Sequence, residues 1–346
     1  MTATVLITGG AGFIGSHAAE ALLAAGERVR VLDDFSTGRR ENLAGMPGAL
    51  EVVEGDVRDG AAVAAAMRGC DRVLHLAAVV SVARSFDDPA ATEAVNVGGT
   101  ANVLAAARAA GVGRVVLASS CAVYGTTTVL PVDEAARVRP ESPYARSKLD
   151  GEELCRAACE DGAIDARVLR FFNVYGPRQD PASDYSGVIA VFMDRLAGGR
   201  PCTVYGDGRQ TRDFVFVTDV VAACRAALDG RASDGQALSV APLNAAPITP
   251  APLNAAPLKS AQLNAVPINV GTGVETSLLE VLAALAGAGG REPVVRFAAA
   301  RQGDIRHSRA ACDRAAEVLG FRSAVTFAQG LAATWSWYVA EGRAAP

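Results

Sequence analysis

A glycine-rich turn near the start of the chain limits the possible folds more than any other feature. The segment Thr8-Gly9-Gly10-Ala11-Gly12-Phe13-Ile14-Gly15 follows a short apolar run and precedes an alanine-rich stretch. In such a turn Gly9 permits a tight bend, Gly12 lets the backbone approach a diphosphate, and Gly15 lets the helix pack close to the strand. The N-terminus of that helix offers free N–H groups and a positive dipole end to an anion. The pattern therefore predicts a strand–turn–helix unit that binds a dinucleotide.

An acidic pair at the end of the next apolar run supports this prediction. Asp33 lies 18 residues after Gly15, where a carboxylate can accept hydrogen bonds from the adenosine ribose. A carboxylate there also repels a 2′-phosphate, so NAD is favoured over NADP. Asp34 follows directly and belongs to the same expected site.

Short β-branched runs alternate with alanine-rich stretches through the first half of the chain. The expected strands are Val5–Thr8, Arg28–Leu32, Leu50–Val53, Arg72–Leu76, Arg114–Ala118 and Ala166–Phe171, and the expected helices are Ser16–Ala25, Ala61–Met67, Val97–Ala110 and Tyr144–Cys159. These strands are apolar almost throughout, as parallel strands buried on both faces are. The alternation predicts the α/β class, with a Rossmann-like, doubly wound parallel sheet.

The second half of the chain does not show this regular alternation of strands and helices. After about Gly176, loops rich in glycine and proline separate shorter elements. We expect residues 1–176 to form an NAD-binding Rossmann domain and residues 177–346 a smaller C-terminal substrate-binding lobe. Segments near 213–240 and 267–275 are expected to return to the first domain.

Residues 241–270 are three ten-residue units, APLNAAPITP, APLNAAPLKS and AQLNAVPINV. Their prolines disfavour both helices and sheet ladders. We interpret this Pro/Ala/Asn-rich decapeptide-repeat insert as a duplicated surface loop that ends in a strand at Pro267–Val270. A polyproline-like arm that binds a partner is the alternative interpretation.

The composition excludes several classes of protein. Half of the residues are apolar and 20% are charged, which is typical of a globular chain with a large core. The net charge of −4 leaves no cationic surplus for nucleic acid, and no apolar run reaches the ~18 residues that span a bilayer. Seven cysteines without a C-x-x-C pair argue against a disulfide framework and a metal site. With no basic stretch typical of a signal peptide, we expect a cytoplasmic protein without nucleic-acid or membrane partners.

A tyrosine and a lysine four residues apart form the candidate catalytic pair. Tyr144 and Lys148 lie on one face of an expected helix. Lowering the phenol pKa by about 3 units would take roughly 4 kcal/mol, which Lys148 and the positive ring of oxidised NAD could supply. Ser120 follows the fifth expected strand and is placed to pass a proton between a substrate oxygen and Tyr144. Cys121 has no histidine base nearby and is expected to line the pocket.

The chain resembles the extended short-chain dehydrogenase/reductase family and, within it, the nucleotide-sugar 4-epimerases for UDP-glucose and UDP-N-acetylglucosamine. The matching segments are TGGAGFIG (8–15), DDFSTG from Asp33, GDV (55–57), HLAA (75–78), SSCAVYG (119–125), SPYARSK (142–148), LRFFNVYGPRQ (169–179), GDGRQTRDF (206–214) and RQGDIRHS (301–308). The resemblance covers nearly the whole chain apart from the repeat insert.

The resemblance implies two sets of site residues. Those expected to bind the cofactor are Gly9, Gly12, Phe13, Ile14, Asp33, Asp34, Ser36, Gly38, Asp56, Val57, Leu76, Ala77, Ala78, Val80, Asn96, Ser119, Tyr144, Lys148 and Phe171. Those expected to bind the substrate are Ser81, Ser120, Cys121, Ala122, Tyr144, Asn173, Gln179, Val188, Thr203, Val204, Tyr205, Arg212, Arg301, Asp304 and Ser308. Arg212 and Arg301 would clamp the diphosphate, because an arginine fork matches phosphate oxygens.

The resemblance also implies a mechanism. Tyr144, as a phenolate, takes the proton of the sugar 4-hydroxyl while the C4 hydride passes to NAD. The 4-keto sugar then turns within the pocket and receives the hydride on its other face, so NAD stays bound. Lys148 orients the nicotinamide ribose, and Ser120 bridges to the reacting oxygen. Relatives dimerise through two helices per subunit, so a homodimer through residues 97–110 and 148–159 is expected.

The choice of substrate stays open at this point. Ser308 stands where glucose-restricted epimerases have a bulky tyrosine, and Ser81 resembles a serine of N-acetylhexosamine epimerases. We therefore favour UDP-glucose and UDP-galactose, their N-acetyl forms, or both. A UDP-glucuronate 4-epimerase is the main alternative, with Arg84 or Arg178 facing the carboxylate. A non-catalytic NAD-binding sensor or scaffold is a distant alternative.

Overall fold

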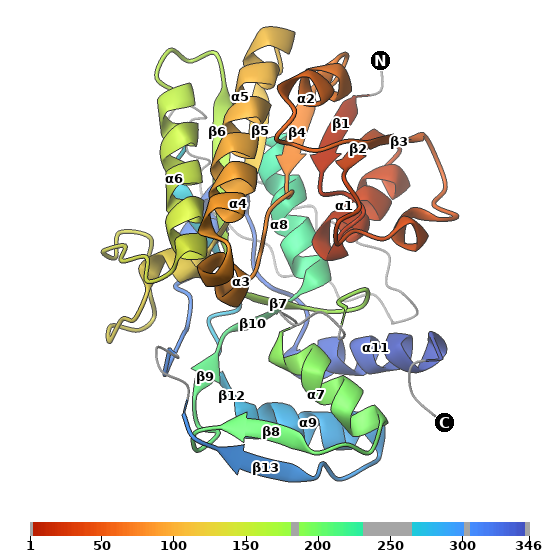
Figure 1. The fold of residues 1–346 in the computed structure, drawn as a ribbon, viewed down its shortest axis with the longest axis vertical. Coiled ribbons are helices and arrows are strands. Elements are labelled where there is room, and N and C mark those ends of the chain that lie inside the picture. Colours follow the sequence, from red (N-terminus) through yellow and green to blue (C-terminus); the bar gives the residue numbers. More distant parts are fainter. Residues whose placement is uncertain (1–2, 181–186, 231–264, 301–304, 343–346) are drawn as a thin grey trace.

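The apolar runs of the sequence form one parallel sheet. The structure, a computed structural model, describes residues 3–180, 187–230, 265–300 and 305–342. The strands of the central sheet are β1 (Thr4–Thr8), β2 (Arg28–Asp33), β3 (Leu50–Glu54), β4 (Arg72–His75), β5 (Arg114–Ser120), β6 (Asp165–Phe171) and β11 (Pro267–Val270). Their order is β11-β6-β5-β4-β1-β2-β3, and every neighbouring pair is parallel (Figure 1). The doubly wound sheet predicted from the sequence is confirmed, and the six predicted strands end within two residues of the observed ones.

Helices cover both faces of this sheet, because successive apolar side chains of each strand point to opposite faces and both sets must be buried. Val5 and Ile7 of β1 pack with α1 (Phe13–Ala24) and α8 (Val217–Asp229) on one face. Leu6 packs on the other face with α2 (Gly60–Met67), α5 (Gly99–Ala110) and α6 (Pro143–Ala158). The helix α10 (Asp313–Leu319) joins the first of these cores.

One helix begins differently from the prediction. The sequence predicts a helix over Val97–Ala110, but α5 begins at Gly99 and is preceded by a wide π-helical turn, η2 (Ala94–Gly98). Two short helices, α3 (Val82–Asp87) and α4 (Pro89–Glu93), lead into that turn and were not predicted. The short helices η1 (Arg40–Leu43) and η3 (Cys121–Tyr124) follow β2 and β5 respectively.

A second group of elements lies beyond the carboxyl ends of the strands of the central sheet (Figure 1). Its helices are α7 (Val188–Ala197), α9 (Leu278–Gly289) and α11 (Phe327–Ala340), which pack around one shared core. Its short strands are β7 (Asn173–Tyr175), β8 (Cys202–Tyr205), β9 (Thr211–Arg212), β10 (Phe214–Phe216), β12 (Thr276–Ser277) and β13 (Val295–Ala298). They pair as β10–β7 and β13–β8, both parallel, and as β12–β9, antiparallel.

The predicted strand after the repeats is confirmed as β11, which pairs with β6 at the edge of the sheet. Most of the decapeptide repeats (residues 241–264) lie outside the described residues. The domain boundary at residues 176 and 177 stays a prediction. None of the helices in the described part of the chain has the length and apolar character needed to span a bilayer.

The strand order places the site. From β1 the chain winds outward to β2 and β3 on one side, and from β4 to β5 and β6 on the other. In such a sheet a crevice opens at the carboxyl ends of the two central strands, and ligands bind there. The glycine-rich turn follows β1 at this edge, and in Figure 1 the second group of elements lies below it.

Candidate active site

The glycine-rich turn forms a tight connection with an open side. Gly9 has a φ of +70°, and a Cβ there would come 2.7 Å from the backbone nitrogen of Ala77. A Cβ on Gly15 would come 2.2 Å from the carbonyl oxygen of Gly9, so α1 packs against the turn too closely for a side chain. A Cβ on Gly12 would meet only that carbonyl oxygen, at 3.2 Å. The helix α1 has no side-chain cap, so its first turn can receive a diphosphate.

Asp33 links this turn to the loop after β2. One carboxylate oxygen accepts a 2.9 Å hydrogen bond from the backbone of Ala11, and the other accepts one of 2.9 Å from Phe35. Burial raises the pKa of this carboxyl. Gly38 packs so close that a Cβ would lie 2.6 Å from Asp33 Oδ1, and Asp34 accepts two hydrogen bonds from Ser36. The acidic pair therefore shapes the rim where the adenosine ribose of NAD is expected.

The two arginines after this loop are already paired. Arg39 bonds to Asp180, and Arg40 bonds to Glu54 and lies over the Phe35 ring, 3.9 Å from its centroid. Their charges are thus balanced by carboxylates, so they are poorly suited to a 2′-phosphate. Together with the open side of Gly12, these residues fit NAD.

The remaining predicted cofactor residues lie at the carboxyl ends of β3, β4, β5 and β6, except Asn96, which lies in the π turn η2. They are Asp56, Val57, Leu76, Ala77, Ala78, Val80, Asn96, Ser119 and Phe171. Two of them support the wall of the site through their side chains. The Asn96 amide exchanges hydrogen bonds with the backbone of Val79 and donates one to Ser147, and the Ser119 hydroxyl donates to Glu152.

The structure brings the three predicted catalytic residues together. Ser142 caps α6 by accepting a 3.1 Å hydrogen bond from Ala145, which places Tyr144 in the first turn and Lys148 one turn later. Ser120 is the last residue of β5, and its hydroxyl is hydrogen-bonded to Tyr144.

Burial dominates the protonation of Tyr144 and Lys148. Burial raises the pKa of Tyr144 to about 12, and the hydrogen bond with Ser120 opposes that rise. Burial lowers the pKa of Lys148 to about 8. The Lys148 ammonium donates to the Ala118 carbonyl at 3.0 Å and lies 5.8 Å from the centroid of the Tyr144 ring. Lys148 alone therefore does not produce the expected lowering of the phenol pKa.

The thiol of Cys121 is neutral at neutral pH, and its place in the pocket lining stays a prediction. Burial raises the pKa of its thiol to about 12, although the nearby Arg212 guanidinium acts in the opposite direction. That electrostatic interaction also places Arg212, on β9, near the catalytic edge. Ala122 follows in η3, and its N–H donates to the Ser120 hydroxyl at 3.1 Å.

Asn173, on β7, and Arg212, on β9, are predicted substrate residues. The side-chain oxygen of Asn173 is buried and has no hydrogen-bond partner among the described residues, so a substrate donor could satisfy it. Asp213 beside Arg212 accepts four hydrogen bonds, from Thr272, Gly273 and Ala310. This residue, which the sequence analysis did not single out, fixes β9.

The other predicted substrate residues differ in how exposed they are and in where they lie. Thr203 is exposed and Tyr205 half-buried on β8, but Val204 between them is fully buried in the core. The Val204 side chain packs in that core, so its predicted contact with the substrate would come from the backbone. Ser308 is half-buried, Val188 begins α7, Ser81 caps α3, and Gln179 precedes α7. Arg301 and Asp304 lie outside the described residues.

A buried ion pair beneath the catalytic group was also missed. Glu152 and Arg170 form two hydrogen bonds, at 2.9 and 2.6 Å, and Arg170 lies over the ring of Tyr124. Glu152 follows Lys148 by four residues, and this spacing could have revealed that the two share a helix face.

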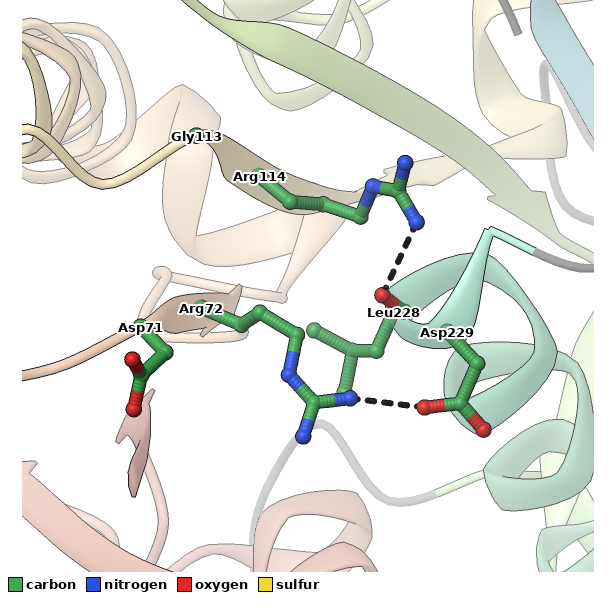
Figure 2. Close-up of a pocket in the computed structure, with 6 residues that line it drawn as sticks. All are labelled: Asp71, Arg72, Gly113, Arg114, Leu228 and Asp229. Atoms are coloured by element: carbon green, nitrogen blue, oxygen red, sulfur yellow. Dashed lines mark hydrogen bonds and ion pairs between the residues drawn. The ribbon is translucent and has the colours of Figure 1, made fainter. Parts of the chain in front are cut away.

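A broad surface hollow of about 560 Å³ lies away from this site. Figure 2 shows its lining, in which Arg72 bonds to Asp229 and Arg114 to the Leu228 carbonyl. Arg72 and Arg114 are the first residues of β4 and β5, so the hollow lies at the amino edge of the sheet. Ligands of doubly wound folds bind at the opposite edge. The hollow is therefore not the catalytic site.

Comparison with known proteins gives consistent matches over the whole chain. A sequence model described as the NAD dependent epimerase/dehydratase family matches residues 5–241. The UDP-glucose 4-epimerase of Mycolicibacterium smegmatis is 41% identical over 337 residues, which cover 96% of this chain and 97% of that protein.

Two solved structures share the fold. The UDP-N-acetylglucosamine 4-epimerase from Methanobrevibacter ruminantium M1, in complex with UDP-N-acetylmuramic acid, has a TM-score of 0.84 at 29% identity. That match covers 99% of this chain and 100% of the other. The UDP-glucose 4-epimerase of Thermus thermophilus, in complex with NAD, has a TM-score of 0.81 at 36% identity, and the match covers 97% of this chain and 99% of that one.

Proposed function

The chain belongs to the NAD-dependent epimerase/dehydratase family, and on that premise we propose that it is a UDP-sugar 4-epimerase that works through bound NAD. The observation that carries the proposal is the meeting of Ser120, Tyr144 and Lys148 at the carboxyl edge of the sheet, beside the glycine-rich turn. The substrate class comes from the relatives, which are named for UDP-glucose and UDP-N-acetylglucosamine.

Each catalytic side chain has a distinct task. Tyr144 removes the proton from the sugar 4-hydroxyl, and Ser120, bonded to the phenol, holds the reacting oxygen. Lys148 binds the nicotinamide ribose and keeps a positive charge beside the phenol. The chemistry that bound NAD supplies is hydride exchange at C4, together with a positive ring charge near Tyr144.

The pocket favours neutral sugars, with or without an N-acetyl group. Ser308 is small, and Ser81 is held in place as the cap of α3. Arg178, a candidate partner for a glucuronate carboxylate, instead bonds to Glu20 on α1 at 2.7 Å. Arg84 is exposed on α3. UDP-glucuronate is therefore the weaker candidate.

The test is proton NMR of the purified protein incubated separately with UDP-galactose, UDP-N-acetylgalactosamine and UDP-glucuronate, without added NAD. We expect the C4 epimer from one or both of the first two. Conversion of UDP-glucuronate alone would support the alternative substrate. If no sugar is converted even with added NAD, the chain is not an epimerase for these substrates, and the sensor or scaffold interpretation gains support.

We also propose a homodimer through α5 and α6. The two helices lie side by side on one face of the sheet (Figure 1). On α5, Ala101 and Ala105 are exposed. Small exposed side chains allow two such helix pairs to approach closely. Sedimentation should give twice the monomer mass, and Ala105→Glu should return the protein to a monomer.

A further inference from the structure

Three consecutive residues of β5 contact three residues on one face of α6. The Ala118 carbonyl accepts from Lys148, the Ser119 hydroxyl donates to Glu152 at 2.5 Å, and Ser120 is hydrogen-bonded to Tyr144. Tyr144, Lys148 and Glu152 are spaced four residues apart, so they align along the helix. The contacts of Tyr144 and Lys148 with β5 are therefore followed, one turn further along α6, by the contact of the Glu152 carboxylate with the same strand.

Glu152 carries a negative charge in the interior of the protein. It is 2% exposed, and its oxygens accept three hydrogen bonds, one from Ser119 and two from Arg170 on β6. Two of these donors belong to the Arg170 guanidinium, which forms an ion pair with the carboxylate. Its charge therefore acts on its neighbours at low dielectric, where charges interact strongly.

Lys148 is one of the groups on which this charge acts. The ammonium is buried and lines a small cavity of about 10 Å³, whose other polar residues are His75, Asn96, Thr100 and Ser147. Asn96, Thr100 and Ser147 are uncharged, and burial lowers the pKa of His75 to about 3, so at neutral pH that ring is neutral.

The titratable groups that face Lys148 are therefore Tyr144 and Glu152 on its own helix and His75 on β4, with Arg170 of β6 behind Glu152. Among these, Glu152 alone is negatively charged at neutral pH.

We propose that Glu152 is a positioning residue for the epimerase reaction, whose buried carboxylate keeps the Lys148 ammonium charged and holds the end of β5, with Ser120, against Tyr144. This inference rests on the proposed function. Burial lowers the pKa of Lys148 to about 8, and Glu152 opposes that fall. Without the carboxylate, Lys148 would lose its proton at a lower pH, and its help to the phenol would be lost with it.

The chain allows a direct test, because Lys148 and Lys259 are its only two lysines. Protein labelled with ¹³C at lysine Cε should give two signals, and Lys259→Arg assigns them. The midpoint of the Lys148 titration is followed by NMR in the wild type, in Glu152→Gln and in Glu153→Gln. Glu153 is the exposed neighbour of Glu152 on the same helix. Glu153→Gln therefore makes the same chemical change at a position exposed to solvent.

We expect the Lys148 midpoint to fall by about one pH unit or more in Glu152→Gln. In Glu153→Gln it should stay within about 0.3 unit of the wild type, because water and salt screen an exposed charge. Glu152→Asp keeps the charge and should also stay near the wild type. An unchanged midpoint in Glu152→Gln, or an equal shift in Glu153→Gln, would overturn the proposal.

The fold must survive the substitution for this comparison to hold. Glu152→Gln leaves Arg170 without its charged partner, which is destabilising. If that protein does not fold, the double variant Glu152→Gln/Arg170→Gln replaces the ion pair with a neutral pair of similar size. Its Lys148 midpoint should fall in the same direction, because Glu152 acts on Lys148 and Arg170 is not among the groups that shift its pKa. The fall should be smaller, because a positive charge is removed together with the negative one.

Turnover gives a second readout. In Glu152→Gln, the alkaline limb of kcat against pH should move down with the Lys148 midpoint, while KM for the UDP-sugar stays within about twofold. A uniform loss of kcat at every pH would indicate a merely structural role. If the wild type converts no UDP-sugar, the proposed function fails, but the lysine titration still decides whether Glu152 keeps Lys148 charged.

Discussion

At the scale of single residues, burial controls the chemistry of the site. Both Tyr144 and Lys148 are nearly inaccessible, and burial disfavours the charged form of each. The protein thus holds the phenol protonated until an additional positive charge is brought next to it. If Tyr144 is the base, as we propose, its ionisation depends on a correctly bound cofactor.

Tyr144→Phe removes the proposed base and should lower kcat by about 10²- to 10⁴-fold, the usual contribution of a positioned acid or base. The ring remains, so the fold and the bound NAD should be kept. Conversion of UDP-galactose by NMR measures the effect. Tyr338→Phe is the control, because its hydroxyl bonds to Asp194 in the second group of elements, and it should change kcat by less than about twofold. Equal activities of the two variants would contradict the assignment.

Asp219, in the first turn of α8, makes stability depend on pH. Burial raises its pKa from 3.8 to about 6, although one of its oxygens accepts hydrogen bonds from Ala324 and Val325 at 3.1 Å. A raised pKa in the folded state means that its favourable contribution is complete below pH 3.8 and is lost as the pH rises through about 6.

Asp219→Asn keeps an acceptor oxygen and removes this titration. We expect the variant to gain roughly 1–3 kcal/mol relative to the wild type between pH 4 and pH 7. Denaturant unfolding of both proteins at the two pH values measures the difference. A stability difference that does not change with pH would show that Asp219 is not the responsible group.

At the scale of elements, the turn between β1 and α1 combines two different requirements for glycine. Gly15 is needed for packing, because a Cβ there would overlap the backbone of Gly9, whereas Gly12 faces open space apart from one contact. The two positions therefore separate folding from cofactor binding.

Gly12→Ala should fold, with a change in unfolding free energy below about 1 kcal/mol, but lose bound NAD because the methyl group occupies the diphosphate position. Gly15→Ala should be strongly destabilised. Thermal unfolding and the NAD released on denaturation measure the two effects. If Gly12→Ala retains NAD like the wild type, the diphosphate does not lie over Gly12.

Much of this architecture could be predicted from the sequence, for identifiable reasons. Parallel strands buried on both faces leave long apolar runs, and their carboxyl ends must share one edge, so the neighbourhood of Asp33, Ser120 and Tyr144 followed from their places along the chain. The π turn at Asn96 could not be predicted, because a helix that widens by one residue has no periodicity of its own.

The contacts of Glu152 with Ser119 and Arg170 were beyond prediction for another reason. They join three elements, α6, β5 and β6, and their geometry depends on how closely these pack. The same holds for Val204, since the strand β8 was not foreseen and the burial of alternate residues could not be assigned.

At the scale of the whole molecule, the proposed site joins the sheet edge to the second group of elements. β7 pairs with β10, and Asp213, between β9 and β10, fastens residues 272–273 and 310 to that group. Arg212 is thereby held near Cys121, which directly follows the last residue of β5, Ser120. A UDP-sugar held by Arg212 would place its sugar ring near Tyr144.

Arg212→Ala should raise KM for the UDP-sugar by about 10- to 100-fold, the effect of losing a charged hydrogen bond worth about 1.5–3 kcal/mol. The value of kcat should change less, because the reacting groups lie on other elements. Steady-state kinetics measure both. Arg296→Ala, at an exposed position on β13, is the control and should leave KM unchanged. A loss confined to kcat would place Arg212 at the reacting centre instead.

The central claim is that hydride leaves C4 and returns to it within one pocket. The most direct measurement uses UDP-galactose and UDP-N-acetylgalactosamine, each carrying deuterium at C4 of the sugar, incubated in ordinary water without added NAD. The account predicts that NMR of at least one mixture shows the C4 epimer with deuterium still at C4. Failure to convert either sugar even with added NAD, or an epimer with hydrogen from water at C4, would contradict it.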